Sequence, residues 1–276
     1  MEKPRTLNVP DVQNEHDDRE IALDQVGVSS LRYPITVMDR DQKEQHVTAT
    51  LSMSVDLPHQ FKGTHMSRFI EVLNGYRGEL TMRTLPQILA ELKTRLNAES
   101  AQIEVNFQYF LERKAPVTGM SGLMDYRCSF QGESNNTDND FVLGVNVPVT
   151  SLCPCSKEIS DYGAHNQRGN VDVQIRSTKD QDGNPRLIWI EEVVDLVEQS
   201  ASAPLYPLLK RPDERHVTMQ AYDNPVFVED LVRNVAVKLK ADERVAWFSV
   251  EAVNQESIHN HNAFARVQWT RPTSLL

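Results

Sequence analysis

The sequence predicts an α+β fold built from two copies of a ββααββ unit, with antiparallel sheets and helices on one face. Three observations indicate this fold class. Segments that alternate between apolar and polar residues, as half-buried strands do, flank segments whose apolar residues recur every three to four positions, as in helices. This order occurs twice along the chain. A turn-rich stretch, G-E-S-N-N-T-D-N at 132–139, separates the two copies.

The first copy is expected at residues 29–135, after a flexible arm at residues 1–28 that is polar and lacks periodicity. Its clearest alternation is T-A-T-L-S-M-S-V-D-L, which indicates a strand with one buried face. Strands are expected over residues 34–38, 46–57, 101–113 and 123–130, and helices over residues 66–73 and 85–96.

The second copy is expected at residues 136–276. Asn224 is predicted to cap its second helix, with Pro225 as the first helical residue. Each sheet would have open edge strands, and pairing between subunits would cover them, so we expect a homo-oligomer. Strands are expected over residues 141–149, 171–176, 245–253 and 263–269, and helices over residues 188–199 and 226–240.

Composition narrows the class of protein. The chain has 276 residues, a formal net charge of −10 and a pI near 5.3, which disfavours nonspecific binding to nucleic acid or membranes. An anionic small molecule is still compatible, because a few local cations suffice for phosphate. No apolar run approaches the roughly 18 residues of a membrane helix, and the start has no signal-peptide core. With an odd number of cysteines, three, a cytoplasmic protein without a disulfide framework is expected.

The most informative stretch is S-L-C-P-C-S-K-E-I-S-D-Y-G-A-H-N-Q-R-G at 151–169, which contains Cys153, Cys155 and His165. Thiolate and imidazole are ligands that suit zinc or ferrous iron. Pro154 favours extended geometry at Cys153, and in an extended C-x-C both thiols point to the same side. A catalytic site would need a third ligand from elsewhere and one open position for water. The alternative is a structural pair of thiols.

Two further segments offer site residues. R-P-D-E-R-H at 211–216 offers Glu214 or His216 as the missing ligand, and the alternative is a solvated, charged loop. Glu229 borders the apolar stripe of the helix expected over 226–240. A carboxylate there would accept hydrogen bonds from the two adjacent N–H groups of a guanine edge, or be an ordinary favourable charge near a helix start.

A histidine-rich segment, E-S-I-H-N-H-N-A at 256–263, connects two expected strands. His259 and His261 would point the same way in an extended chain. Together with Glu256 they would relay protons, because imidazole titrates near neutral pH. The alternative is an exposed polar hairpin.

A basic segment, K-G-T-H-M-S-R-F at 62–69, surrounds the start of an expected helix. Its His65, Ser67 and Arg68 would bind phosphate together with the free N–H groups of the helix start. The alternative is an ordinary helix cap. The chain contains no glycine-rich dinucleotide motif, Walker A motif or G-x-S-x-G nucleophile elbow.

These segments together resemble a known family. L-C-P-C-S-K-E-I-S-x-Y-G-A-H-N-Q-R-G resembles the type IB GTP cyclohydrolase I family, and G-T-H-M-S-R-F, L-L-K-R-P-D-E, N-P-x-F-V-E-D and E-S-I-H-N-H are similar to its other motifs. The resemblance covers residues 30–272. It implies tandem tunnelling-fold (ββααββ) modules in a toroidal homotetramer. It also implies conversion of GTP and water to 7,8-dihydroneopterin triphosphate and formate, the first step of tetrahydrofolate biosynthesis.

The resemblance also implies roles for individual residues. One divalent metal ion per subunit, zinc, manganese or iron, would activate water for attack on the guanine ring. The implied metal ligands are Cys153, which is therefore also part of the catalytic set, His165 and Glu214. The implied acid/base groups are His259 and His261, with Glu256 beside them, and Glu229 would anchor guanine. The candidates for triphosphate contacts are His65, Ser67 and Arg68.

Three alternatives stay open at the level of sequence. One is a tunnelling-fold nitrile reductase with a cysteine nucleophile and NADPH, whose expected E-S-K-S-type motif is absent here. Another is a noncatalytic metal- or purine-binding module, which would not need His259 and His261. The third concerns Cys155, which would be a supporting thiol, an alternative ligand or a redox-sensitive neighbour of Cys153.

Overall fold

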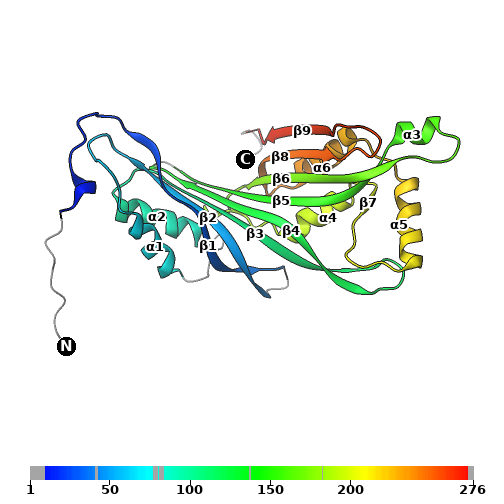
Figure 1. Cartoon of the computed structure of the whole chain (residues 1–276), viewed down its shortest axis with the longest axis horizontal. Coiled ribbons are helices and arrows are strands. Elements are labelled where there is room, and N and C mark those ends of the chain that lie inside the picture. Colours follow the sequence, from blue (N-terminus) through cyan, green and yellow to red (C-terminus); the bar gives the residue numbers. More distant parts are fainter. Residues whose placement is uncertain are drawn as a thin grey trace.

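The computed structural model of the chain describes residues 10–40, 43–76, 80, 84–136, 138–181 and 183–272. Long strands run along most of the molecule, with helices packed against them (Figure 1). The strands are β1 (Leu23–Met38), β2 (Glu44–Leu57), β3 (Ala101–Lys114), β4 (Ser121–Ser134), β5 (Asn139–Leu152), β6 (Asn166–Ser177), β7 (Ala203–Pro204), β8 (Val245–Asn254) and β9 (Ala263–Thr270). The helices are the 3₁₀ turn η1 (Val12–Asn14), α1 (Met66–Gly75), α2 (Leu85–Leu96), α3 (Pro154–Ile159), α4 (Ile190–Glu198), α5 (Arg211–Asp223) and α6 (Val228–Ala241).

The strands form one antiparallel sheet in the order β1-β2-β3-β4-β5-β6-β8-β9, and the short β7 pairs with β5. Within the described residues, β1 and β9 are the edges of this sheet. Neighbouring strands are therefore also successive in the chain, apart from the excursion between β6 and β8 that contains α4, α5 and α6.

The two faces of the sheet differ in polarity, because residues paired directly across strands lie on the same side. One side is apolar from β2 to β8, where the successive paired and buried residues are Leu51, Val105, Phe130, Leu143, Ile175 and Phe248. Side chains of α1, α2, α4 and α6 join these residues in one hydrophobic cluster, so these helices cover the apolar face. The other side is polar, with Arg127, Asn146, Asp172, Glu251 and Arg266 paired in succession.

The α+β class, the antiparallel pairing and the order of the first unit are confirmed. The helix expected over 85–96 is α2 with the same bounds, and the strand expected over 46–57 is β2 with two further residues at its start. The other expected strands are present and mostly longer than predicted. Strand ends that carry polar residues on both faces, such as Leu23–Arg32 of β1, show too little alternation to be recognised from sequence.

The second unit contains more helices than predicted. Residues 211–216, for which no helix was predicted, are the first turns of α5. Asn224 follows the last residue of α5 and does not cap α6, which begins at Val228 after Phe227. The reason lies in the segment between the helices, where the amide of Val226 donates a hydrogen bond to the carbonyl of Leu152 at 3.0 Å. This bond ties residue 226 to the end of β5, and α6 begins two residues later.

Two predicted boundaries also differ from the structure. β1 begins at Leu23, so residues 23–28 belong to the sheet and not to the arm expected at residues 1–28. Residues 1–9 of that arm lie outside the described residues. The turn-rich stretch 132–139 connects β4 to β5, which pair from Arg127–Asn146 to Ser134–Asn139. The two units are therefore continuous through the sheet at this point. No helix in the described part of the chain is long and apolar enough to cross a membrane.

Candidate active site

A cavity of about 270 Å³ lies where β5 and β8 end and where β6 and α6 begin. Four separate parts of the chain line it: the hairpin of β5 and β6, the first turn of α6, the end of β8, and the loop before β9. The titratable side chains at its surface are Cys153, His165, Glu229, Glu256, His259 and His261. The structure therefore brings together six of the predicted site residues from segments about 100 positions apart.

Cys153 and His165 meet because the β5–β6 hairpin folds back on itself. The backbone amide of Cys153 donates to the carbonyl of His165 at 3.1 Å, next to the strand pair Leu152–Asn166. Cys153 is extended, as Pro154 requires, but Pro154 is also the first residue of α3. Cys155 is therefore helical and exposed and does not line the cavity. The expectation that both thiols point to the same side is wrong.

The imidazole of His165 is oriented by its neighbours. Its Nδ1 lies 2.9 Å from Oε1 of Gln167, and Oε2 of Glu256 is 4.0 Å away. An amide oxygen can only accept, so Nδ1 carries the proton and Nε2 keeps its lone pair. Metal-binding histidines are commonly held in this way by a second hydrogen bond. The thiol of Cys153 is free, and its sulfur accepts a hydrogen bond from the amide of Ser156 at 3.4 Å. The donor atoms of both residues fit a divalent metal.

His259 and His261 lie in the loop between β8 and β9. Their rings are stacked, with centroids 5.1 Å apart and planes inclined by 22°. The chain bends at both residues and is not extended as the prediction assumed, but the two rings still lie side by side. Both side chains are exposed at the mouth of the cavity, while the side chain of Glu256 is only 10% exposed. Two imidazoles and a buried carboxylate are groups that can hold and pass protons at neutral pH.

Glu229 lies in the first turn of α6 and lines the same cavity. It is exposed in the single chain. The start of α6 is fixed to the end of the sheet by two hydrogen bonds: the amide of Val226 donates to Leu152, and Oγ of Ser151 donates to the carbonyl of Val226. The carboxylate is thus attached to the same sheet end that carries Cys153.

Glu214 does not reach the cavity of its own chain. It is exposed at the start of α5, as is His216, and neither lines the cavity. The far end of α5 is next to α3, where Nζ of Lys157 donates to the carbonyl of Tyr222 at 2.5 Å (Figure 1). Eight positions separate Glu214 from Tyr222, about 12 Å along a helix axis. Among the described residues, no three His, Cys, Asp or Glu side chains are grouped as a metal site.

The start of α5 is instead tied to the turn between β3 and β4. Asp213 is buried, and its carboxylate accepts hydrogen bonds from the amides of Val117, Thr118 and Lys210 and from the Thr118 hydroxyl, at 2.7–2.9 Å. Burial alone would raise the pKa of Asp213, but these hydrogen bonds outweigh it and hold the pKa well below its usual range. Asp213 therefore fixes the position of the neighbouring Glu214.

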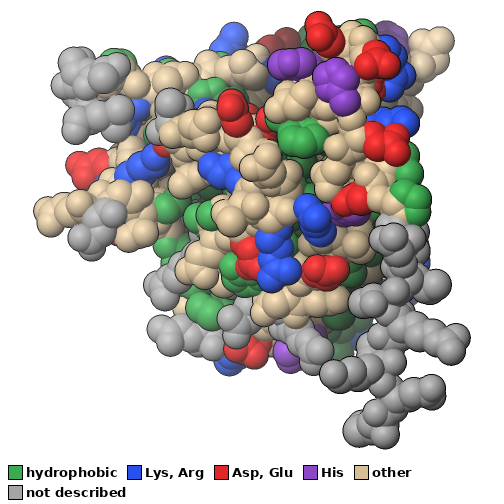
Figure 2. Space-filling view, turned by 90° about the vertical axis from the view of Figure 1, so that its left-hand side faces the viewer, with side chains coloured by type: hydrophobic (Ala, Val, Ile, Leu, Met, Phe, Trp, Pro, Cys, Tyr) green, Lys and Arg blue, Asp and Glu red, His purple; other side chains and the backbone are tan. Residues whose placement is uncertain are grey.

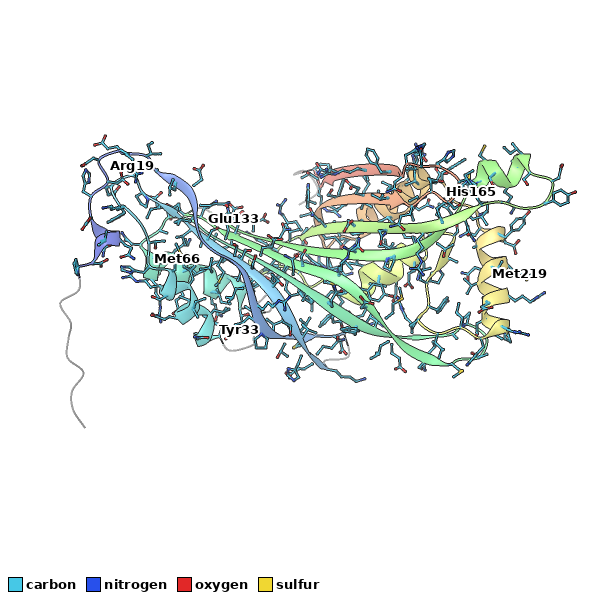
Figure 3. All side chains as sticks on the ribbon, in the orientation of Figure 1. Arg19, Tyr33, Met66, Glu133, His165 and Met219 are labelled. Atoms are coloured by element: carbon cyan, nitrogen blue, oxygen red, sulfur yellow. The ribbon has the colours of Figure 1, made fainter. Side chains whose placement is uncertain are left out.

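The basic residues at the start of α1 lie far from the cavity. Met66, next to His65, and His165 are at opposite ends of the molecule (Figure 3). Nε2 of His65 is 3.2 Å from Asp11, without hydrogen-bond geometry, and Arg68 donates to the carbonyl of Arg95 at 3.0 Å. Figure 2 shows this end of the molecule, where Lys and Arg side chains are interspersed with Asp and Glu side chains. The structure does not bring His65, Ser67 or Arg68 to the cavity of the same chain.

Three polar residues of the cavity were not identified from the sequence. Ser151, Gln167 and Asn254 line it from the ends of β5, β6 and β8, and all three are buried. Each occupies a position on the apolar face of its strand, where a hydrophobic residue is the rule. A polar residue at an expected core position is the signal that would have identified them.

The fold and the cavity together define an α+β protein with a set of thiol, imidazole and carboxylate groups gathered at one end of an antiparallel sheet. Solved structures with this architecture include uricase from Arthrobacter globiformis, which has a TM-score of 0.54 at 8% identity, over 91% of this chain and 94% of that one. A urate oxidase mutant from Bacillus sp. TB-90 has a TM-score of 0.51 at 10% identity, over 90% and 99%. These tunnelling-fold-like neighbours support the expected fold.

Sequence comparison identifies the family. Residues 9–265 match the family model described as type I GTP cyclohydrolase folE2. GTP cyclohydrolase FolE2 of Syntrophotalea carbinolica is 54% identical over 259 residues, covering 94% of each chain. The FolE2 of Syntrophus aciditrophicus is 54% identical over 258 residues, covering 94% of this chain and 98% of the relative. The chain belongs to the FolE2 family and is a GTP cyclohydrolase of folate biosynthesis. The nitrile reductase and the noncatalytic module are thereby set aside.

Proposed function

We propose that this chain converts GTP and water to 7,8-dihydroneopterin triphosphate and formate in a metal-dependent reaction at the cavity beside α6. The observation that carries the proposal is the gathering of Cys153, His165, Glu256, His259 and His261 at one sheet end. A divalent metal ion, zinc, manganese or iron, would be held by Cys153 and His165 with Glu214 as the third ligand. When bound, it supplies the Lewis acidity that makes a water nucleophilic at neutral pH.

Protein side chains bind the base and transfer the protons. Glu229 accepts hydrogen bonds from the guanine edge, which orients the base in the cavity. His259 and His261 transfer protons to and from the atoms of the ring bonds that are cleaved. Their rings are stacked, so both imidazoles are held together at the cavity. Glu256, whose Oε2 is 4.0 Å from Nδ1 of His165, lines the same cavity as these groups. Gln167 keeps Nε2 of His165 available as a ligand.

The site is completed by a second copy of the chain. Glu214 is about 12 Å along α5 from the end of the helix that contacts α3, so we infer that it serves a neighbouring subunit's cavity. The edges β1 and β9 have no partner strand within the described chain, and pairing between subunits would satisfy them. A toroidal homotetramer closes such a set of edges without leaving one open.

The triphosphate contacts are proposed to come from a further subunit. His65, Ser67 and Arg68 lie at the opposite end of the chain from the cavity, so they reach GTP only across an interface (Figure 3). A cationic side chain there would bind a phosphate oxygen, and Arg68→Ala should raise the KM for GTP with little change in kcat. An unchanged KM would remove Arg68 from the binding site.

The protein is also proposed to act in the cytoplasm, without binding nucleic acid or membranes. Cys128, Cys153 and Cys155 are all free thiols, which a reducing compartment preserves. The net charge of −10 disfavours attachment to anionic polymers and anionic lipid surfaces.

The metal dependence is tested by a matched pair of cysteine variants. Cys153→Ala should lose the bound metal and the activity, because it removes a proposed ligand. Cys155→Ala should keep both, because that thiol is exposed and outside the cavity. Elemental analysis of the purified proteins and fluorescence of the oxidised pterin product measure the two properties. Full metal occupancy in Cys153→Ala, or metal loss in Cys155→Ala, would contradict the assignment.

A further inference from the structure

Asn254, at the end of β8, carries a buried polar atom that the fold leaves without a partner. The residue is 2% exposed and lines the cavity. Its Oδ1 has no hydrogen-bond partner among the described residues. Buried acceptors in native proteins are nearly always satisfied, by the protein, by ordered water or by a ligand. Because Asn254 lines the cavity, a ligand atom that donates to Oδ1 would supply the missing partner.

The orientation of this amide is determined by a chain of hydrogen bonds. Oγ of Ser151 lies 3.0 Å from the carbonyl oxygen of Val226, which can only accept. The single hydroxyl proton of Ser151 is used in that bond, so Ser151 must accept from Asn254, whose Nδ2 is 3.1 Å away. The amide nitrogen therefore faces Ser151, and the unpaired atom is the oxygen. A flipped amide would bring two acceptors together.

Gly169 leaves the space that this amide occupies. It pairs with Asn254 across β6 and β8, and a Cβ at Gly169 would lie 2.6 Å from Oδ1. The side chain of Asn254 thus crosses over Gly169 to reach Ser151 on β5. Through Ser151 it is connected to Val226, three positions before Glu229 on the same segment. Oδ1 of Asn254 is therefore linked, through the hydrogen bonds of Ser151, to the segment that carries the carboxylate of Glu229.

We propose that Oδ1 of Asn254 accepts a hydrogen bond from the 2-amino group of the guanine base. This inference rests on the proposed role of Glu229 as the guanine anchor. A carboxylate that takes the ring N–H and one hydrogen of the 2-amino group leaves the second amino hydrogen without an acceptor. The side-chain oxygens of Ser151 and Gln167 are already engaged, with Val226 and His165. Asn254 thus adds to the preference for guanine over bases without an amino group.

The test compares binding of GTP and of inosine triphosphate (ITP), which differs only in lacking the 2-amino group. The full-length assembled protein is stripped of metal with a chelator, so that neither nucleotide is turned over, and affinities are measured by calorimetry. The wild type should prefer GTP. Asn254→Ala should bind GTP about tenfold more weakly with little change for ITP, as expected for the loss of one buried hydrogen bond.

Two further variants separate binding from folding. Asn254→Leu keeps the shape of the side chain without its polar atoms, and should lose the same part of the GTP preference. Asn254→Asp keeps an acceptor at Oδ1 but sets a second oxygen against Oγ of Ser151, so it should bind both nucleotides more weakly while the preference for GTP is retained. If the wild type prefers GTP but the Ala and Leu variants prefer it equally, the inference is overturned and Oδ1 binds water. If the wild type binds both nucleotides equally, guanine recognition by Glu229 at this cavity fails as well.

Discussion

At the scale of single residues, the cavity depends on small and polar side chains in positions that would ordinarily be hydrophobic. Ser151, Gln167 and Asn254 lie on the apolar face of the sheet, yet each is satisfied or directed by a neighbour in the site. The polar atoms at the sheet end form a connected set, in which each side chain fixes the donor or acceptor role of the next.

Gly169 is the residue at which this set is most sensitive to added volume. In Gly169→Ala the new methyl group would lie 2.6 Å from Oδ1 of Asn254, so the amide or the strand must shift. We expect the free energy of unfolding to fall by about 1–3 kcal/mol, the usual effect of overpacking a buried site. Chemical denaturation at matched protein concentration measures this change.

The control for that substitution is Gly75→Ala at the end of α1, where an added Cβ would meet nothing within 4 Å. Its unfolding free energy should equal or slightly exceed that of the wild type, because alanine favours the helical state. Equal stability of the Gly169 and Gly75 variants would show that the amide of Asn254 is not held against the strand.

At the scale of secondary structure, α5 is held at its start by a side chain and at its end by the backbone. The carboxylate of Asp213 binds the β3–β4 turn through Val117 and Thr118, and Lys157 binds the carbonyl of Tyr222. The helix has only two buried residues, Asp213 and Ala221. Its position therefore depends on these polar contacts more than on apolar packing.

Asp213→Ala should release the start of α5 from the turn. Three backbone amides would lose their acceptor, so the urea concentration at the midpoint of unfolding should fall clearly. Asp223→Asn, which changes an exposed carboxylate at the other end of the same helix, serves as the control and should unfold like the wild type. Identical midpoints for all three proteins would contradict the role assigned to Asp213.

The sparse apolar content of α5 also explains why it was not predicted. Helices such as α2 and α6 have an apolar stripe, and the sequence shows it as a period of three to four residues. In α5 the buried positions are a carboxylate and an alanine, so the segment looks like a charged loop. Asn224 and Pro225 resemble the start of a helix, but tertiary contacts of Val226 shift that start to Val228.

The site itself was predictable where reactive residue types cluster along the sequence. Cys153, His165, His259 and His261 stand in short polar segments, and the cavity collects them as expected. The positions of Glu214 and His65 relative to the cavity were not predictable, because they depend on the length and direction of α5 and α1. Spacing in the sequence carries no information on which subunit a side chain serves.

At the scale of the whole molecule, the site is proposed to be shared between subunits, and mixing inactive variants tests this. Cys153→Ala and Glu214→Ala should each be inactive alone. Assembled together in equal amounts, about one interface in four would combine an intact Cys153 with an intact Glu214, so up to about a quarter of wild-type activity should return. Activity is measured after the mixture is unfolded and refolded together.

The matched control mixes Cys153→Ala with His165→Ala. Both residues belong to the same cavity of one chain, so no mixed interface restores the site. Recovery in this control, or no recovery in the first mixture despite mixed assemblies of the expected mass, would indicate that Glu214 acts within its own chain.

The succession of strands in the sheet has a consequence for how the chain is made. From β1 to β6 every strand pairs with the strand synthesised just before it, and only the connection between β2 and β3 contains a pair of long helices, α1 and α2. Apart from β3, each new strand finds its partner after closing only a short connection, so the entropy lost on closure is small. The nascent polypeptide can therefore extend its sheet one hairpin at a time as it leaves the ribosome. The cavity forms last, since β8 and the loop that carries His259 emerge near the end of synthesis.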